Sequence, residues 1–231
     1  MKFTGEQYVP GQTDKTIEDE HLSRYEFASR YIKDKIVLDV ACGTGYGSKI
    51  MSSTAKQVIG VDISDEVIKF AKEHYQNNNL EYFCHDSTSL FFSEHYFDVI
   101  ISFETIEHLS DSDRELYLKE IWRVLKAGGT FIISTPNKII TSPHSKIPKN
   151  KFHITEYTAE DLKKILKDHA LNPEKIYGQR QIKKSINNYL AKLFMMATGK
   201  FKKTYLEASG PKVEEIKDGF EATYLVIVCK K

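Results

Sequence analysis

Cysteine, tryptophan and long apolar runs are scarce in this sequence of 231 residues. Its three cysteines, Cys42, Cys84 and Cys229, have spacings that fit neither a disulfide framework nor a paired-thiol metal site. We therefore expect reduced thiols and a cytoplasmic protein. No apolar run approaches the roughly 20 residues of a membrane-spanning helix. Residues 1–11 also lack the apolar core of a signal peptide.

An excess of either charge is absent as well. Lysine and arginine total 33, aspartate and glutamate total 32, and the formal net charge is +1. Because dedicated nucleic-acid-binding proteins carry a basic face, the composition argues against that class. The hydrophobic share of 41% and the charged share of 28% are ordinary for a globular protein. The length suits one α/β domain with an appendage.

The sequence does contain short apolar runs that alternate with amphipathic stretches. The predicted strands are residues 36–41, 57–62, 80–84, 97–103, 129–135, 175–179 and 223–229. The predicted helices are residues 17–32, a stretch from residue 46, and residues 64–75, 113–125 and 158–169. Such alternation is typical of a parallel sheet with helices on both faces.

The first two predicted strands end in residues suited to bind a nucleoside. Asp39 precedes glycines at 43, 45 and 47, and Asp62 ends the second strand. Glycines let a ligand approach backbone N–H groups at a helix N-terminus, and a carboxylate can accept hydrogen bonds from a ribose diol. A dinucleotide-binding loop ends in Gly or Ala where this chain has Ser48, so that match is imperfect.

The loop instead resembles the first motif of class I S-adenosylmethionine-dependent methyltransferases, and the resemblance covers nearly the whole chain. It implies a Rossmann-like α/β fold with a seven-stranded, mostly parallel sheet whose last strand is antiparallel. It also implies S-adenosyl-L-methionine as cofactor, with Asp62 at the ribose and Asp86 near the adenine, although an Asp at a strand end is often only a turn residue. The predicted cofactor-binding residues are Asp39, Gly43, Gly45, Asp62, Ile63, Asp86, Ser87 and Phe103.

Acidic and imidazole side chains cluster after the fourth predicted strand. Glu104, Glu107 and His108 are offset by three and four positions, which one helical turn would bring to the same side. These groups would repel or desolvate one another unless a cation gathered them, and mixed oxygen and nitrogen ligands suit Mg²⁺ or Mn²⁺. A fourth ligand is available in residues 151–158, which follow the fifth strand at the same sheet edge.

This combination resembles two metal-dependent branches of the superfamily. They are the small-RNA 3′-terminal 2′-O-methyltransferases and the ubiquinone-pathway O-methyltransferases. The resemblance implies that Glu104, Glu107, His108 and His153 hold a divalent metal beside the acceptor hydroxyl. Many metal-free methyltransferases also carry a Glu-His pair at this point, so a metal-free active site is the alternative. Glu104 and His108 are catalytic candidates in both cases.

The N-terminal segment, through residues 5–11 and 20–25, resembles bacterial methyltransferases of surface-polysaccharide sugars. In that family this helix closes over the cofactor. We expect His21 to act as a general base if its pKa lies near the operating pH, while a surface histidine on a packing helix is an equal alternative.

We expect one methyltransferase domain made of four segments. They are a cofactor-covering segment (1–34), a core (35–181), a helical insertion (182–219) and a last strand (220–231). The insertion is interpreted as a substrate lid, and a homodimer contact is its alternative role.

The favoured function is divalent-metal-assisted O-methylation of a sugar hydroxyl, in a uronic acid or another polysaccharide-related saccharide. A small phenol or quinone precursor is the alternative acceptor and predicts an apolar pocket. Methylation of an RNA 3′ end shares the metal motif, but the balanced charge makes nucleic acid an unexpected partner. A cofactor-binding protein without catalysis is a further alternative, against which the Glu and His cluster argues.

Overall fold

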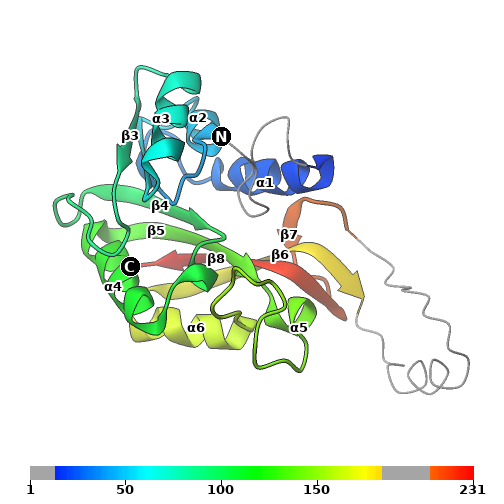
Figure 1. Ribbon diagram of the computed structural model, residues 1–231. Helices are drawn as coiled ribbons and strands as arrows, with labels where there is room; N and C mark the ends of the chain where they lie inside the picture. Colours follow the sequence, from blue (N-terminus) through cyan, green and yellow to red (C-terminus); the bar gives the residue numbers. More distant parts are fainter. Residues whose placement is uncertain (1–13, 184–208) are drawn as a thin grey trace, which may run out of the picture.

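The computed structural model describes residues 14–183 and 209–231 (Figure 1). The strands are β1 (Ile36–Val40), β2 (Gln57–Asp62), β3 (Leu80–Cys84), β4 (Phe97–Phe103), β5 (Leu125–Pro136), β6 (Asn172–Lys183), β7 (Val213–Glu215) and β8 (Phe220–Lys230). The helices are α1 (Lys15–Ala28), α2 (Tyr46–Met51), α3 (Asp65–His74), α4 (Asp111–Val124), α5 (Lys138–Thr141) and α6 (Ala159–Asp168), with a 3-10 turn η1 (Ile106–His108).

All described strands join one sheet in the order β3-β2-β1-β4-β5-β8-β6-β7. The strands from β3 to β5 in this order are parallel, and β8 runs antiparallel to both of its neighbours. The predicted Rossmann-like α/β sheet, mostly parallel with an antiparallel last strand, is therefore confirmed.

The predicted number of seven strands is wrong, because the described sheet has eight. The additional strand, β7, pairs antiparallel with β6 from Tyr177↔Glu215 to Gln179↔Val213. It lies in the segment predicted as a helical insertion, and three residues are too few to show a strand period. Residues 184–208 of that insertion and residues 5–11 lie outside the described residues, so a lid or a dimer contact stays a prediction.

Side-chain caps set the starts of the helices close to the predicted positions. Ser64 accepts a hydrogen bond from the Val67 N–H at the start of α3. At the start of α6, the side chains of Thr158 and Asp161 each accept a hydrogen bond from the other residue's backbone N–H. Among the described helices, none combines the length and the apolar character that crossing a bilayer requires.

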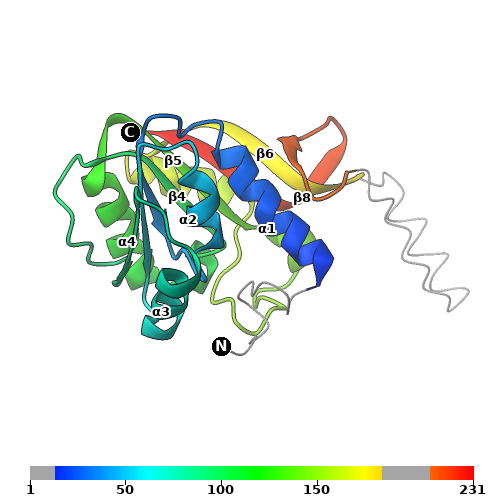
Figure 2. The same cartoon turned by 90° about the horizontal axis from the view of Figure 1, so that it is seen from above.

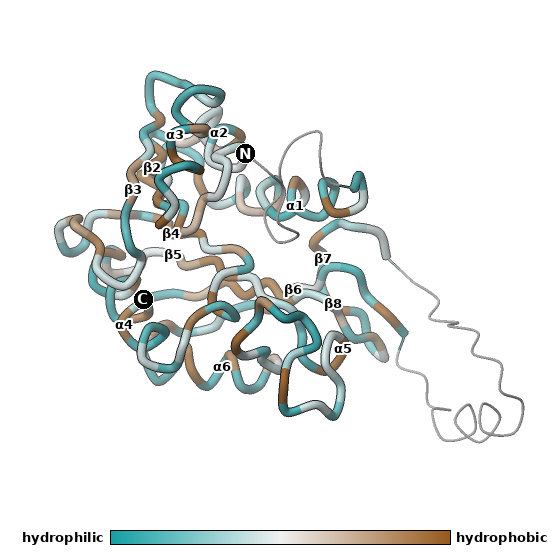
Figure 3. Tube along the Cα trace, viewed as in Figure 1, coloured by the Kyte–Doolittle hydropathy of each residue, from teal (hydrophilic) through white to brown (hydrophobic). Residues whose placement is uncertain are grey.

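The sheet has a hydrophobic core on each face. Helices α1, α2 and α3 cover one face, and α4 and α6 cover the other (Figures 1 and 2). Side chains alternate along the strands, so Val37 of β1 packs into the first core and Leu38 into the second. Figure 3 shows hydrophobic segments along the central strands, while the helices alternate between hydrophobic and hydrophilic stretches.

Helix α1 packs over the glycine-rich loop through Tyr25. A Cβ at Gly47 would lie 2.0 Å from Cζ of the Tyr25 ring, so only glycine admits this ring against α2. The Tyr25 hydroxyl donates a hydrogen bond of 3.3 Å to Asp39. Figure 2 shows α1 running beside α2. The third glycine of the loop therefore accommodates a helix of the protein itself.

Gly47→Ala is expected to lower the free energy of unfolding by roughly 1–3 kcal/mol, because the added methyl group displaces the Tyr25 ring and α1. Denaturant unfolding measures this change. Gly210→Ala is the matched control, since no heavy atom lies within 4 Å of a Cβ at that position. Equal stability of the two variants would contradict this packing of α1.

Candidate active site

A cavity of about 960 Å³ opens where the parallel strands β1 to β4 end. Loops after these strands form most of its wall, and α1 closes one side. Parallel strands deliver their carboxyl ends to one edge of the sheet, which is where open α/β sheets bind ligands. The predicted site residues that line it are His21, Gly43, Asp62, Ile63, Asp86, Ser87, Phe103, Glu104 and His108.

Two glycines shape the loop between β1 and α2. Gly43 and Gly45 have φ angles of +55° and +84°, which residues with a Cβ rarely adopt. A Cβ at Gly45 would also lie 2.7 Å from the Ala71 side chain and 2.8 Å from the Tyr82 ring. The loop can therefore take this path past the cavity only with glycine at residue 45.

Asp62 lies at the end of β2 with its carboxylate fixed by the backbone. Its two oxygens accept hydrogen bonds from the N–H groups of Gly43 and Ser64, both at 3.0 Å. Burial raises the pKa of Asp62, and these N–H groups oppose that shift. A carboxylate oxygen can accept more than one hydrogen bond, so Asp62 can also receive hydroxyl groups of a ligand in the cavity.

The loops after β2 and β3 form the next part of the cavity wall. Ile63 is 72% exposed and lines the cavity, as do Asp86 and Ser87 after β3. Asp86 also accepts hydrogen bonds of 2.8 Å from the backbone and side chain of Thr88. Asp86 therefore stabilises a turn and faces the cavity as well.

Asp39 lies beneath the cavity and does not line it. It is fully buried and accepts hydrogen bonds from the Ser48 hydroxyl at 2.6 Å and the Tyr25 hydroxyl at 3.3 Å. Burial raises its pKa to about 7, against the effect of these two hydrogen bonds. Asp39 thus joins β1, α1 and α2 under the loop, and it would act on a ligand through the loop.

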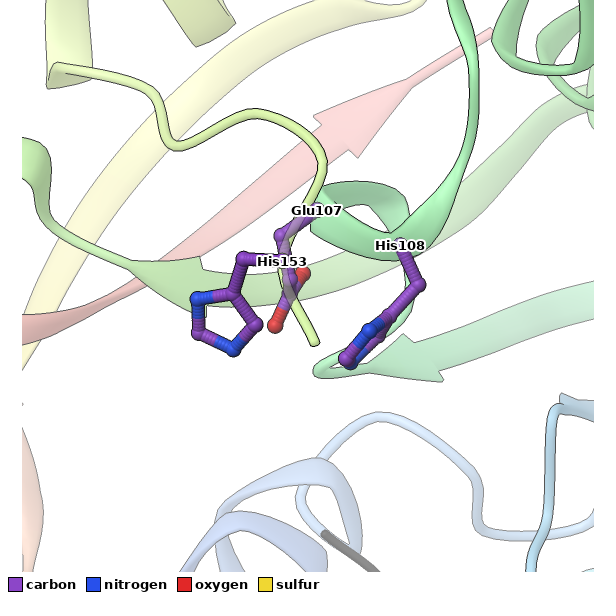
Figure 4. Close-up of side chains that lie close together, drawn as sticks. All are labelled: Glu107, His108 and His153. Atoms are coloured by element: carbon purple, nitrogen blue, oxygen red, sulfur yellow. The ribbon is translucent and has the colours of Figure 1, made fainter. Parts of the chain in front are cut away.

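Three of the four predicted metal ligands lie together. One potential ligand atom from each of Glu107, His108 and His153 lies within 4.8 Å of the other two. Figure 4 shows the Glu107 carboxylate between the two imidazole rings. Glu107 Oε2 accepts a hydrogen bond of 2.9 Å from Thr135, whereas the buried Oε1 has no partner among the described residues. A divalent cation would supply that missing partner.

Backbone and side-chain acceptors orient the two histidines of this group. His108 Nδ1 donates to the Phe152 carbonyl at 3.0 Å, so its Nε2 carries the lone pair. His153 Nδ1 donates to Glu156 at 2.8 Å, an arrangement common behind metal-binding histidines. Asn150 Nδ2 donates to His153 Nε2 at 2.9 Å, so this amide would have to turn away if Nε2 bound a metal.

Glu104 does not belong to this group, because the predicted helical turn does not include it. The 3-10 turn begins at Ile106, and Glu104 has a φ angle of +52°. Its Oε1 accepts a hydrogen bond of 2.6 Å from Ser134 and lies 3.9 Å from Nη1 of Arg24. Glu104 thus contacts Arg24 of α1, and its charge, after burial, is the next cause that raises the pKa of Glu107.

His21 lines the cavity, but its pKa does not lie near the operating pH, as a general base would require. Its Nδ1 lies 2.8 Å from the Tyr46 hydroxyl. Burial, with a smaller effect of Arg24, lowers the pKa of His21 to about 2. The imidazole is therefore neutral at physiological pH and a weak base.

Sequence reasoning missed Arg24, Ser134 and Thr135, which contact the acidic residues of the site. Arg24 lies three residues after His21 and one before Tyr25. Helical spacing could have placed it on the side of α1 that carries His21. Ser134 and Thr135 lie at the end of β5, where only the strand pairing with β4 reveals their neighbours.

Comparisons with known proteins agree on one family. A model described as "Methyltransferase domain" matches residues 38–133. Two mycobacterial proteins, each named "Probable S-adenosylmethionine-dependent methyltransferase", are similar to the chain. The one from Mycolicibacterium smegmatis is 30% identical over 77% of this chain. The one from Mycobacterium tuberculosis is 31% identical over 73% of it. The chain spans 68% and 60% of their lengths.

Two further proteins resemble this chain, one in sequence over less than half of its length and the other in fold alone. A ubiquinone biosynthesis O-methyltransferase of Coxiella burnetii is 37% identical over 109 residues, which are 46% of each protein. The second is a solved complex of the Haloferax volcanii Trm112 methyltransferase activator with a methyltransferase. One chain of that complex superposes on this chain with a TM-score of 0.66. That match has 20% identity and covers 94% of this chain and 91% of that one.

The buried Asp39 generates a prediction about pH. Between about pH 4 and 7 the folded protein keeps a proton on Asp39 that the unfolded chain has lost, so stability falls as the pH rises through this window. Asp39→Asn has no such proton to lose. The free energy of unfolding of this variant, relative to the wild type, should rise by on the order of 4 kcal/mol between pH 4 and 8. Urea unfolding of the ligand-free proteins measures it, and a difference independent of pH would contradict the burial of an ionisable Asp39.

Proposed function

The chain belongs to the S-adenosylmethionine-dependent methyltransferases, and we propose that it is a divalent-metal-assisted O-methyltransferase that acts on a sugar hydroxyl, such as one of a uronic acid. The observation that carries the proposal is the group formed by Glu107, His108 and His153. His108 from this group lines the same cavity as the predicted nucleoside-binding residues.

The residues around the cavity fit the methyl donor, which supplies an electrophilic methyl group on a sulfonium. The loop at Gly43 and Gly45 would hold its methionine end through backbone groups. The fixed carboxylate of Asp62 would accept hydrogen bonds from the ribose hydroxyls. Ile63 would pack on the adenine, with Asp86 and Ser87 at its edge.

The residues of the Glu107 group fit a divalent cation. They offer one carboxylate oxygen without a hydrogen-bond partner among the described residues and two imidazoles held by other groups. Nitrogen and oxygen ligands of this kind suit Mg²⁺ or Mn²⁺, with imidazole favouring the latter. When bound, such an ion acts as a Lewis acid that lowers the pKa of a coordinated hydroxyl.

The protein's own residues then have to orient the acceptor and remove its proton. Because the pKa of His21 is about 2, this residue is a poor proton acceptor and is better suited to a hydrogen bond with the acceptor. The carboxylate of Glu104, which lines the cavity with His108, would accept the proton of the acceptor hydroxyl. Phe103, Leu109 and Phe152 line the same cavity, and their apolar side chains can exclude water from it. Correct alignment of the two reactants supplies a large part of the rate.

A sugar is favoured by the polar groups at this end of the cavity, His21, Glu104 and His108, which can bind several hydroxyls. A small phenol or quinone precursor is the second candidate. It is supported by the Coxiella ubiquinone biosynthesis relative and by the apolar side chains of Phe103, Leu109 and Phe152. The net charge of +1 disfavours an RNA acceptor.

Removal of the metal tests the first part of the proposal. EDTA treatment is expected to abolish methyl transfer, and Mg²⁺ or Mn²⁺ should restore it. His108→Ala and His153→Ala should lower turnover roughly 100-fold or more and weaken Mn²⁺ binding in calorimetry. The exposed His74→Ala is the control that should change neither. Full turnover in EDTA would remove the metal from the reaction.

An acceptor panel tests the second part. Uronic acids and their glycosides, catechols and a short RNA are offered with labelled S-adenosylmethionine, and transfer to each is measured. We expect the highest kcat/KM with a uronic acid or related sugar. A preference for catechols would favour the phenol alternative, and transfer to RNA alone would contradict both.

A further inference from the structure

Asn150 lies against the group formed by Glu107, His108 and His153, and the structure fixes which end of its side-chain amide faces which neighbour. The backbone N–H of Phe152 can only donate, and it donates to Asn150 Oδ1 at 3.1 Å. The amide nitrogen Nδ2 therefore faces the other way, where it lies 2.9 Å from His153 Nε2. Asn150 is thus a hydrogen-bond donor to this imidazole.

The second nitrogen of the His153 ring defines what Nε2 can do. Nδ1 lies 2.8 Å from the carboxylate of Glu156, which accepts hydrogen bonds, so Nδ1 carries the ring proton and Nε2 the lone pair. Figure 4 shows one nitrogen of this ring pointing away from Glu107 and the other lying nearer to it. A neutral imidazole has one such lone pair, and here it accepts the Asn150 N–H. The Asn150 amide and a cation would therefore compete for one atom.

The same amide also closes a tight turn over residues 150–153. Its Oδ1 holds the Phe152 N–H, and the Asn150 carbonyl accepts a hydrogen bond of 3.2 Å from the His153 N–H. The Phe152 carbonyl in turn accepts a hydrogen bond of 3.0 Å from Nδ1 of His108. This one turn therefore contacts both histidines of the group.

Release of Asn150 would alter the cavity wall. Oδ1 and Nδ2 belong to one rigid, planar amide, so a rotation that takes Nδ2 away from His153 also takes Oδ1 away from the Phe152 N–H. The Phe152 side chain lines the cavity that also contains His108. A cation at His153 would thus loosen the turn that positions Phe152.

Resting on the metal of the proposed function, we propose that Asn150 sets the metal affinity of this group, because it competes with the cation for His153 Nε2. When the cation binds, the amide of Asn150 leaves both His153 and the Phe152 N–H. Metal binding and the position of Phe152 at the cavity wall are therefore coupled through the turn at residues 150–153. Asn150 acts on the reaction through His153 and Phe152, as a positioning residue.

Calorimetry with Mn²⁺ alone, at about pH 8 where imidazoles are neutral, tests the competition. Asn150→Ala is expected to bind Mn²⁺ about 3- to 10-fold more tightly than the wild type, since the ion no longer displaces a hydrogen bond. Asn150→Asp keeps an acceptor for the Phe152 N–H, removes the donor to Nε2 and adds an oxygen ligand. It should bind at least as tightly as Asn150→Ala. Asn78→Asp adds the same charge at an exposed asparagine before β3 and should behave as the wild type.

Hydrogen exchange of the Phe152 N–H, followed by NMR, tests the release and needs no variant. Saturating Mg²⁺ should speed up this exchange in the wild type, because the amide oxygen that protects the N–H leaves. In Asn150→Ala the exchange should be fast with and without Mg²⁺. The Ile139 N–H is the matched control, since it donates to Asn137 Oδ1 in the same kind of turn and should exchange at one rate throughout.

Several results would overturn the proposal. Weaker Mn²⁺ binding by Asn150→Ala with unchanged binding by Asn150→Asp would make Asn150 a turn-forming residue only. Equal affinity of the wild type and both variants would exclude the competition, and slower exchange of the Phe152 N–H in Mg²⁺ would exclude the release. Failure of all three proteins to bind Mn²⁺ would refute the metal of the proposed function and this proposal with it. Binding by the two variants alone would support the competition.

Discussion

The parallel register of β1 with β2 and β4 is the constraint on which the site depends. Val40 of β1 lies beside Val61 of β2 on one side and Ser102 of β4 on the other. Because these three strands end together, the glycine loop, Asp62 and the Glu107 segment emerge at one edge of the sheet. A shift of one residue in this register would turn alternate side chains to the other face and separate these groups.

Helix α1 spans this edge from the glycine loop to the end of β4. Tyr25 fits against Gly47 and hydrogen-bonds Asp39 beneath the loop, while Arg24 stands near Glu104 at the end of β4. Gln179 of β6 fixes Arg24 from the opposite side and also donates to the Glu20 carbonyl on the same helix. One helix thus contributes packing, a buried charge and a wall of the cavity.

The sequence predicted the sheet and the glycine-rich turn after its first strand well, because both follow from local patterns. Apolar runs gave the strands, and the glycines at 43 and 45 do adopt the positive φ angles that make glycine necessary. It failed where a distant segment or a single backbone angle decides. The three residues of β7 have no pattern of their own and depend on pairing with β6. The left-handed conformation of Glu104 broke the helical turn assumed for it, and the burial that lowers the pKa of His21 depends on the packing of α1.

The central claim is that a divalent cation lies beside the methyl donor, held by Glu107, His108 and His153. Crystals grown with S-adenosylhomocysteine and Mn²⁺ test it most directly, through the anomalous scattering of manganese. The account predicts a manganese peak in contact with these three side chains, in the same cavity as the bound nucleoside. Fully occupied S-adenosylhomocysteine without manganese at this group would contradict it.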